Sequence, residues 1–516
     1  MSAREKALAV GVAVATRLTF WLVTGRVFED ALITLAHARN AALGLGLVHH
    51  GGEEVAVHGF TSALSVVIPL GGELIAPDSG LLVLRFVSLI AAALTVLVAL
   101  QIAEELALGR TTRWFMVVFL AFNTNHVFYG MVGMETQIAV LALLASILLV
   151  VQRRSAVIIG LSLGATLLAR PDFVLWAIAV LMAGLLTHRR RTATIALWSA
   201  ITVAPWIVFT TFYYGSPIPN TIGAKSDVWG GLHLLIGGDQ TDFGLFIDQS
   251  VRSGRKLLLS FAPFFDNSQV IRAPVPFVAA ITMSIIVFVF AVRGGVALRS
   301  RIEWWPVLGF VAAYSLYRLF ALPDYYFDWY VPPYTAVLIV LAAKGIDTTE
   351  SLSDAFKTGV ALVLSVAVAL PLPWVIGLER NIASDIDAGV RVPMARYLDS
   401  VANGDTVVAE SAGFIGYYSG VVLWDYPGLT SRTSRDALEG IPNPSLERLI
   451  VELEPNWLVL RPFELDDLHE AFPDAAARYE LIRRFGREPT GVAKYGRLII
   501  WSIDESFLVL RLDPAT

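Results

Sequence analysis

The 516-residue sequence contains no cysteine, so disulfide bonds and thiolate metal sites are excluded. Charged residues are also scarce, at 16% of the chain against about 25% in typical soluble domains. The formal net charge is −5, and there is no basic stripe with interleaved aromatic residues, which argues against nucleic-acid binding. Apolar residues instead make up 56% of the chain, and the mean hydropathy is +0.64. We therefore predict an integral membrane protein.

About eleven apolar runs approach or meet the length of about 20 residues that a membrane-spanning helix needs. The runs are 7–24, 81–106, 112–131, 135–151, 155–169, 172–187, 193–213, 274–293, 303–322, 329–345 and 358–377. We interpret the first run as an uncleaved span rather than a signal peptide. The further run 60–77 is interrupted by Pro69 and Gly71-Gly72-Glu73, and we predict that it lies at the membrane interface without crossing.

Lysine and arginine clusters in the short loops predict the orientation of the spans. The clusters are Arg4/Lys6, Arg110/Arg113, Arg153/Arg154, Arg189-Arg190-Arg191, Arg293/Arg299/Arg301 and Lys344/Lys357. Placing all of them in the cytoplasm gives a consistent alternation. The predicted membrane domain is then 1–378, with outer loops 25–78 and 214–273, and the segment 379–516 lies outside the plasma membrane.

The segment 379–516 is predicted to be a small α/β domain, because short apolar runs alternate there with helical patterns. The predicted strands are Thr406–Ala409, Val421–Trp424, Trp457–Leu460, Leu498–Ile503 and Phe507–Leu512. The predicted helices include Arg391–Ala402, Ser445–Leu453 and Ala471–Phe485. The order of the strands in the sheet cannot be read from the sequence.

Two adjacent carboxylates, Glu29 and Asp30, follow the first apolar run. Charged groups next to hydrocarbon are costly, so carboxylates at a membrane edge are candidates for function. We predict that the loop 25–78 is the catalytic loop of a membrane enzyme. The alternative is that Asp30 only caps the helix that follows it.

Other unusual residues gather in the loops that are predicted to face outward. They are Arg39, His49, His50 and His58, then Glu135, Arg170-Pro171-Asp172, Tyr213–Thr221 with Lys225, and Pro323–Tyr330. Carboxylates, bases and aromatic rings on one membrane face suit an amphiphilic substrate. Ordinary roles are the alternatives: pairing of Arg170 with Asp172, a helix cap at Glu135, surface histidines, a snorkelling Lys225, and an aromatic belt of Tyr325, Tyr326, Trp329 and Tyr330.

The first outer loop resembles that of polyprenyl-phosphate-sugar-dependent glycosyltransferases of the C-type (GT-C) fold, above all the actinobacterial terminal β-(1→2) arabinofuranosyltransferases. The matching residues are Glu29–Thr34, Ala38-Arg39-Asn40, Gly44–Val48, Gly52-Glu53 and Gly59–Ser62. Other segments match in the same order: Gly133–Thr136, Ala169–Asp172, Tyr213–Thr221 with Ala224-Lys225, Gly413–Tyr418, Asp425 and Gly428-Leu429-Thr430. The resemblance covers the whole chain.

This resemblance implies an inverting transfer of a sugar, with arabinofuranose as the first expectation, from a polyprenyl-phosphate donor to a cell-envelope glycan such as arabinogalactan or lipoarabinomannan. Asp30 or Glu29 would accept the proton of the acceptor hydroxyl, with Asp30 favoured, and both are candidate ligands of a divalent cation (Mg²⁺, Mn²⁺ or Ca²⁺). The candidate phosphate-binding residues are Lys225, Arg170, Arg39 and Arg272, and the candidate substrate-binding residues are His58, Glu135, Asn220, Tyr325, Tyr326 and Asp328.

The chain also departs from the family pattern. Ala36-His37 stands where the family usually has Arg-Tyr, His58 stands in place of a glutamate, and Ala63 stands in place of a proline. These changes leave open a mannosyl-type transferase and a non-catalytic member whose tail binds glycan. A transporter or flippase of polyprenyl-linked sugars is the alternative from another class, although no internal repeat of the kind common in transporters is visible.

Overall fold

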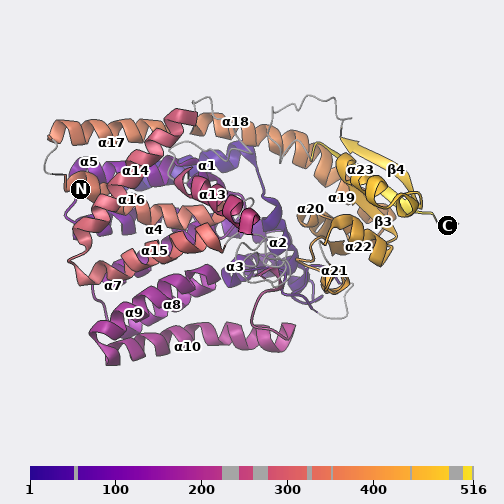
Figure 1. Ribbon diagram of the computed structural model, residues 1–516, viewed down its shortest axis with the longest axis horizontal. Coiled ribbons are helices and arrows are strands. Elements are labelled where there is room, and N and C mark those ends of the chain that lie inside the picture. The colour runs from indigo at the N-terminus through magenta and orange to yellow at the C-terminus, as the bar shows by residue number, and fades with distance from the viewer. Residues whose placement is uncertain are drawn as a thin grey trace. The chain divides into compact units, whose positions relative to one another are not determined.

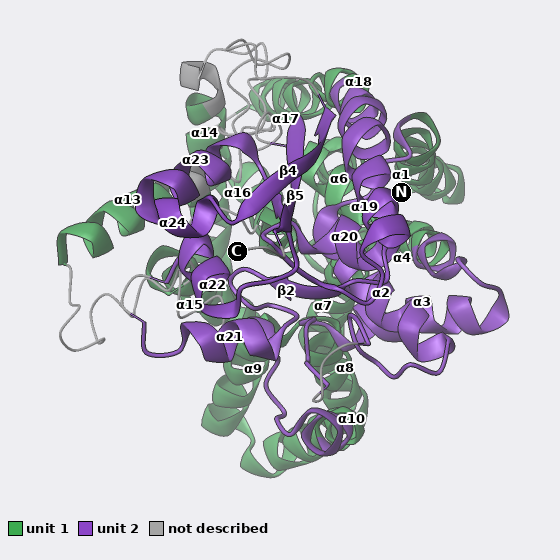
Figure 2. Cartoon of the chain, turned by 90° about the vertical axis from the view of Figure 1, so that its right-hand side faces the viewer, with its two compact units in different colours: residues 1–23, 85–207, 230–377 green, residues 24–84, 208–229, 378–516 purple. Residues whose placement is uncertain are grey.

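The computed structural model describes residues 1–51, 56–222, 243–259, 277–321, 328–349, 353–441, 444–486 and 504–513, without the side chains of 255, 256, 258, 259 and 277–280. Four predicted site residues, Lys225, Arg272, Tyr325 and Tyr326, lie outside the described residues, as does the predicted strand Leu498–Ile503. The chain forms two compact units (Figure 2). Unit 1 is Met1–Val23, Arg85–Ile207 and Gly230–Gly377, and unit 2 is Thr24–Leu84, Val208–Trp229 and Leu378–Thr516.

The described part of unit 1 consists of helices, most of which are labelled in Figure 1. They are α1 (Ala3–Thr24), α4 (Gly80–Glu105), α5 (Arg110–Phe122), α6 (Thr124–Met131), α7 (Thr136–Val151), α8 (Ala156–Ala169), η1 (Pro171–Phe173), α9 (Val174–Thr187), α10 (Arg189–Tyr214), α13 (Phe243–Leu259), α14 (Phe277–Leu298), η3 (Ile302–Trp304), α15 (Trp305–Phe320), η4 (Asp328–Tyr330), α16 (Val331–Asp347) and α17 (Asp354–Ala369). The ends of α1, α4 and α10 belong to unit 2, and the first residues of α18 (Leu372–Ile382), up to Gly377, belong to unit 1.

Within the described residues the predicted apolar runs are mostly helical, but several of the helices are shorter than a full span. Within the described residues six helices are long and apolar enough to cross a membrane: Ala3–Thr24, Gly80–Glu105, Arg189–Tyr214, Ile281–Leu298, Asp328–Asp347 and Asp354–Val401. The pair α6 and α7, bent by 115°, raises the number to seven if it is one span. Helix α3 (Ala63–Ile75), in the run 60–77, is among the shorter apolar helices. The chain is thus a multi-pass membrane protein.

The turns that carry the predicted cytoplasmic clusters lie at one end of unit 1. Polar contacts join them: Arg110 to Glu5 at 2.7 Å, Lys6 to Glu104 at 2.9 Å, Gln152 to Glu105 at 2.7 Å and Arg153 to Glu303 at 3.1 Å. Basic turns that the charge pattern assigns to one membrane face are therefore close in space.

Unit 2 combines the first loop of the chain with an α/β domain. Its helices are α2 (Glu29–Ala42), α3, α18 (Leu372–Ile382), the π-helical segment η5 (Ala383–Arg391), α19 (Val392–Val401), α20 (Ala412–Tyr418), α21 (Arg432–Leu438), α22 (Leu446–Leu453), α23 (Pro462–Ala471) and α24 (Pro473–Ala476). The strands are β1 (Thr406–Ala409), β2 (Val422–Asp425), β3 (Trp457–Leu460), β4 (Tyr479–Gly486) and β5 (Ser506–Leu512). The described strands pair in the order β2-β1-β3-β5-β4.

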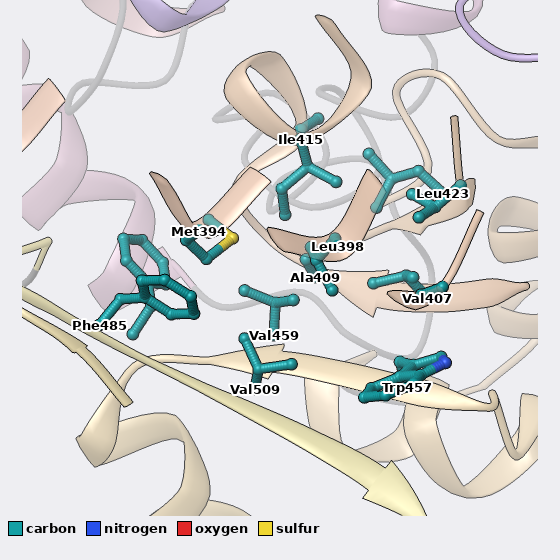
Figure 3. Close-up of a cluster of buried hydrophobic side chains, with 14 of the residues drawn as sticks. Met394, Leu398, Val407, Ala409, Ile415, Leu423, Trp457, Val459, Phe485 and Val509 are labelled. Carbon is teal, nitrogen blue, oxygen red and sulfur yellow. The ribbon is translucent and has the colours of Figure 1, made fainter. Parts of the chain in front are cut away.

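Strands β1, β2 and β3 are parallel, whereas β5 is antiparallel to β3 and to β4. Alternate side chains of the central strands bury two cores, since successive residues of a strand point to opposite faces. Figure 3 shows one core, where Met394 and Leu398 of α19 meet Val407, Val459 and Val509. The other face of the sheet is covered by buried residues of α21, α22, α23 and α24.

The prediction of a helix over Ala471–Phe485 is wrong. The segment contains the end of α23, the short α24, and then the edge strand β4, which pairs with β5 through a register shift between Leu481 and Arg483. Its apolar residues Leu481, Ile482 and Phe485 have helical spacing, but pairing with β5 decides the structure. Local spacing cannot show that such a partner strand exists.

Helix α2 lies against α20 and α3 within unit 2 (Figure 1). Its buried residues Leu32 and Leu35 pack with Phe414 of α20, while Ile33 enters the core beneath the sheet. Because both apolar faces of α2 are buried in this way, its first turn is held at a fixed place beside β1. That turn carries the two predicted catalytic carboxylates.

Candidate active site

Glu29 is the first residue of α2, and residues of the tail bind its carboxylate. Its Oε1 accepts a hydrogen bond from the Ser411 hydroxyl at 2.6 Å and one from the Gly413 backbone N–H at 3.3 Å. Its Oε2 lies 3.8 Å from a guanidinium nitrogen of Arg391. The Glu29 side chain is 21% exposed, so solvent still reaches it.

Asp30 is the second residue of the same helix and is half-buried. The alternative that it caps α2 is not what the structure shows, because the capping position is Phe28 and no side chain makes a cap hydrogen bond. Both carboxylates lie in the first turn, where the helix dipole favours negative charge. Successive helical residues point about 100° apart. Asp30 therefore leaves α2 about 100° around the helix axis from Glu29.

A buried series of ion pairs continues from Arg391. Its guanidinium binds Asp387 at 3.0 Å and also Asp504. Asp387 in turn binds Arg26 at 2.5 Å, and Arg26 binds Glu379 at 3.0 Å. Arg391 and Arg26 are almost completely buried, so removing one partner would leave an uncompensated charge, which is strongly destabilising.

Asp504 connects the same series to Arg461, which follows β3. The Arg461 guanidinium also binds Glu464 at 2.6 Å and Glu410 at 2.7 Å. Glu410 directly precedes Ser411 at the end of β1, so the charges run along the carboxyl ends of the parallel strands. The tail thus brings a network of ion pairs to the first turn of α2, where Arg391 faces Glu29.

Arg39 lies near the other end of α2. It donates a hydrogen bond to the carbonyl of Tyr417 at 3.0 Å, and its charge lies 5.3 Å from that ring. Its side chain is 38% exposed. Residues 30 and 39 are separated by about 14 Å along a helix and by about half a turn around it. Arg39 and Asp30 therefore lie on opposite faces of α2.

The predicted surface histidines are instead buried. His49 and His58 are 2% and 3% exposed, and His50 is half-buried. His58 stacks on Tyr214 with the rings 4.7 Å apart and almost parallel, and it contacts Phe60. Burial among these rings lowers the pKa of His58 to about 3. A neutral, packed His58 belongs to the core of the loop rather than to its surface.

Asn220 joins three segments of unit 2. Its side-chain amide donates to the carbonyls of Gly428 at 2.7 Å and Leu429 at 3.2 Å, and accepts from Arg435 at 2.6 Å. Its backbone N–H donates to the carbonyl of His58 at 3.0 Å. These bonds fix the segment after Tyr213-Tyr214 against the loop 428–429 of the tail.

Three predicted site residues, Arg170, Glu135 and Asp328, belong to unit 1, whereas Glu29 belongs to unit 2. Arg170 is buried and binds Asp172 at 2.9 Å and Glu135 at 3.3 Å, with the Tyr330 ring 4.0 Å from its charge. Glu135 occupies the capping position of α7 without making a cap hydrogen bond. Asp328 is buried at the start of η4. Arg170 thus has its alternative role, a structural ion pair with Asp172 between two helix ends.

Glu29 and Asp30 were also predicted as ligands of a divalent cation. In the described part of the chain, no group of three or more His, Asp or Glu side chains is placed to hold a metal ion. Glu29 has its oxygens directed at Ser411, Gly413 and Arg391. The divalent cation stays a prediction from the resemblance.

Sequence reasoning did not single out Ser411 or Arg391. Ser411 lies 382 residues from Glu29 in sequence, and a lone serine after an apolar strand carries no distinctive signal. Arg391 was only the start of a predicted helix. Gly413 had a signal, because it opens the segment Gly413–Tyr418 that matches the family, but nothing in that match pointed to Glu29.

Comparison with known proteins identifies the fold. The chain is similar to the crystal structure of ArnT from Cupriavidus metallidurans bound to undecaprenyl phosphate, with 10% identity and a TM-score of 0.55 over 99% of this chain and 98% of that chain. It is similar to the apo form of ArnT, with 12% identity and a TM-score of 0.55 over 98% and 97% of the two chains. The arabinofuranosyltransferase AftD from mycobacteria shares 14% identity at a TM-score of 0.46, and the match covers 99% of this chain but 40% of AftD.

Sequence comparison adds one match. Residues 380–500 match a domain of unknown function, DUF8728. No curated protein matches the chain. The likeness to ArnT over the full length of both chains shows that this multi-pass protein has the fold of the GT-C glycosyltransferases, with a small α/β domain at its carboxyl end.

Proposed function

We propose that the chain is a membrane glycosyltransferase that moves a sugar from a polyprenyl-phosphate donor to a hydroxyl acceptor, with Asp30 as the general base. The observation that carries the proposal is the carboxylate pair at the start of α2, in which the tail binds Glu29 and Asp30 is the next residue of the same half-buried turn. The fold supports it, because ArnT, which shares the fold, is known in complex with undecaprenyl phosphate.

In the proposed reaction the acceptor oxygen attacks the anomeric carbon as its proton passes to the Asp30 carboxylate. The bond between the anomeric carbon and the phosphate oxygen breaks, and its electron pair leaves with polyprenyl phosphate. The anomeric configuration inverts in this single displacement. An aspartate with a pKa near ~3.9 in its ordinary state is a weak base, but phosphate is a good leaving group, so a weak base is sufficient.

The leaving phosphate needs a positive charge or hydrogen-bond donors. Arg170 already binds two carboxylates in unit 1, and Arg39 lies on the face of α2 opposite Asp30. We therefore assign the phosphate first to Lys225, from its place after the matching segment Tyr213–Thr221. The sugar, arabinofuranose by resemblance, the envelope-glycan acceptor and the outer face of the plasma membrane are parts of the same proposal.

The test is transfer by the purified protein in detergent from a panel of synthetic polyprenyl-phosphate sugars, arabinofuranose and mannose first. Asp30→Asn should lower kcat by about 10²- to 10⁴-fold, the usual contribution of a positioned general base. Asp466→Asn, at an exposed carboxylate of α23, is the matched control and should transfer at the wild-type rate. Lys225→Ala should weaken use of the donor.

Two results would contradict the proposal. Wild-type rates in Asp30→Asn would remove Asp30 as the base. Tight binding of the lipid donors without transfer, combined with movement of those lipids across liposome membranes, would instead identify the chain as a transporter.

A further inference from the structure

An open α/β sheet usually holds a ligand at the carboxyl ends of two neighbouring parallel strands where the chain changes direction. In the tail these strands are β1 and β3. Strand β1 lies between β2 and β3, and all three are parallel. The chain leaves β1 toward β2 and later returns to the opposite side of β1 as β3. Ligands bind outside the carboxyl ends of strands at such a change of direction. Glu410 and Ser411 follow β1 at this point, and Arg461 follows β3.

In this protein the position beside the end of β1 is taken by Glu29 of its own first loop. The Ser411 hydroxyl, which is itself buried, and the Gly413 N–H both donate to one oxygen of the Glu29 carboxylate. Arg391 faces the other oxygen at 3.8 Å. Hydrogen bonds from two donors to one carboxylate fix its orientation more firmly than either bond alone, and bonds to a charged group are the stronger kind.

Gly413 shows how close this approach is. A Cβ atom at position 413 would lie 2.2 Å from the Glu29 carbonyl oxygen and 2.7 Å from its Cγ. Backbone atoms cannot move aside as a flexible side chain can. Glycine is therefore required if the first turn of α2 is to reach the tail. The φ angle of Gly413 is not positive, so the backbone conformation does not itself require glycine. The close approach to Glu29 is the reason for glycine at this position.

We propose that Ser411, Gly413 and Arg391 form a cradle that positions Glu29, and through it the neighbouring Asp30, for sugar transfer. Glu29 is then a held carboxylate and not a second base. The tail contributes positioning residues to the reaction of the first loop. This inference rests on the proposed function, since it assigns roles within the same reaction.

The cradle makes a prediction that a merely structural contact does not make. If Ser411 acts only through Glu29, then Ser411→Ala should lower kcat by about 10- to 100-fold, the effect of one hydrogen bond to a charged group. KM for the donor should stay within about twofold, because the interaction affects the reacting geometry and not binding. Ser411→Thr keeps the hydroxyl and should recover much of the rate.

A double-mutant cycle gives the decisive readout. Glu29→Gln should lower kcat to a similar degree as Ser411→Ala, and the double variant should be no slower than Glu29→Gln alone. Losses of kcat that multiply in the double variant would overturn the cradle, as would a Ser411→Ala effect on KM alone. Gly413→Ala should reduce kcat at least as much as Ser411→Ala. Gly359→Ala in α17, where a Cβ also meets nothing within 4 Å, is its control and should leave kcat unchanged.

Failure of the cradle can be told apart from failure of the proposed function. If wild-type protein transfers sugar from no donor, the proposed function fails, and the same cycle is measured by thermal unfolding of the purified protein. Coupled losses of stability for Glu29→Gln and Ser411→Ala would keep the contact and remove its enzymatic role. Additive losses would remove the contact as well.

Discussion

At the scale of single residues, two departures from the family pattern meet in space. His37 and His58 both contact Phe60, with ring centroids 5.0 and 4.7 Å apart, although the two histidines lie in different segments of the first loop. His49 lies 5.6 Å from His37, and neither of its ring nitrogens has a hydrogen-bond partner among the described residues. His37 and His58 thus pack around Phe60, and His49 packs against His37, as neutral imidazoles inside the first loop. The first loop therefore depends on these rings staying unprotonated.

Stability should consequently fall as the solution becomes acidic. Burial lowers the pKa of His37 and of His50 to about 4 and that of His58 to about 3, from the ordinary value of 6.5. Below pH 6.5 the unfolded chain binds protons that the folded loop does not. The stabilising contribution is thus complete above about pH 6.5 and is lost as the pH falls toward 4.

Each such histidine adds up to about 1.4 kcal/mol per pH unit to the dependence of the unfolding free energy. Thermal unfolding in detergent between about pH 7.5 and about pH 5.5 measures this dependence. His58→Phe keeps an aromatic ring on Tyr214 and should make the dependence shallower. His469→Phe, at an exposed histidine of α23, should leave it unchanged. An equal dependence in wild type and His58→Phe would contradict the assignment.

At the scale of elements, two tyrosines at the end of α10 hold the glycine-rich turn after α2. The Leu47 N–H donates to the Tyr213 hydroxyl at 2.8 Å, and the Tyr214 hydroxyl donates to the Leu47 carbonyl at 2.7 Å. Gly46 has a φ of +95°, and a Cβ there would lie 2.5 Å from the Tyr213 hydroxyl. The turn and the two tyrosines are therefore a single structural element.

Removing one tyrosine hydroxyl should loosen this element. Tyr214→Phe should lower the free energy of unfolding by about 0.5–1.5 kcal/mol, the net value of one hydrogen bond. Gly46→Ala should cost more, because it combines a collision with an unfavourable backbone conformation. The measurement is thermal unfolding. Tyr397→Phe, whose ring packs on Phe485 in the tail, is the control and should change stability less.

The elements also show what the sequence could and could not predict. Strands Thr406–Ala409 and Trp457–Leu460 were predicted with their observed bounds, because apolar runs of about four residues are too short to form a helix. The run 112–131 is broken at Asn123, whose side chain caps α6 by accepting from the N–H of His126 at 3.2 Å. A capping asparagine inside an apolar run is a local signal, but hydropathy alone conceals it.

Part of the candidate site could be predicted from the sequence and part could not. The sequence singled out Glu29 and Asp30, since carboxylates next to an apolar run are costly. The partners of Glu29 were not predictable, because they come from the far end of the chain and are a serine and a backbone N–H. The burial of His58 was missed for a related reason: its partners Phe60 and Tyr214 are ordinary aromatic residues in sequence.

At the scale of the whole molecule, the contacts between basic turns make the orientation testable. Arg110 pairs with Glu5 and Arg153 pairs with Glu303, so turns from well-separated parts of the chain share one end of unit 1. From the excess of arginine and lysine in these turns we predict that this end lies in the cytoplasm. The tail, with the cradle for Glu29, should then lie outside, on the side where a lipid-linked sugar would meet an envelope glycan.

The absence of cysteine allows this orientation to be measured with single substitutions. Ser300 lies between Arg299 and Arg301 in a basic turn, Ser400 lies in α19 of the tail, and both are exposed. We expect Ser400→Cys to react with a membrane-impermeant maleimide in intact cells, because no bilayer separates it from the medium. Ser300→Cys should react only after the membrane is permeabilised. Wild-type protein is the control, since it has no thiol. The reverse pattern would place the carboxylates of α2 in the cytoplasm, where the donor would have to be used before it crosses the membrane.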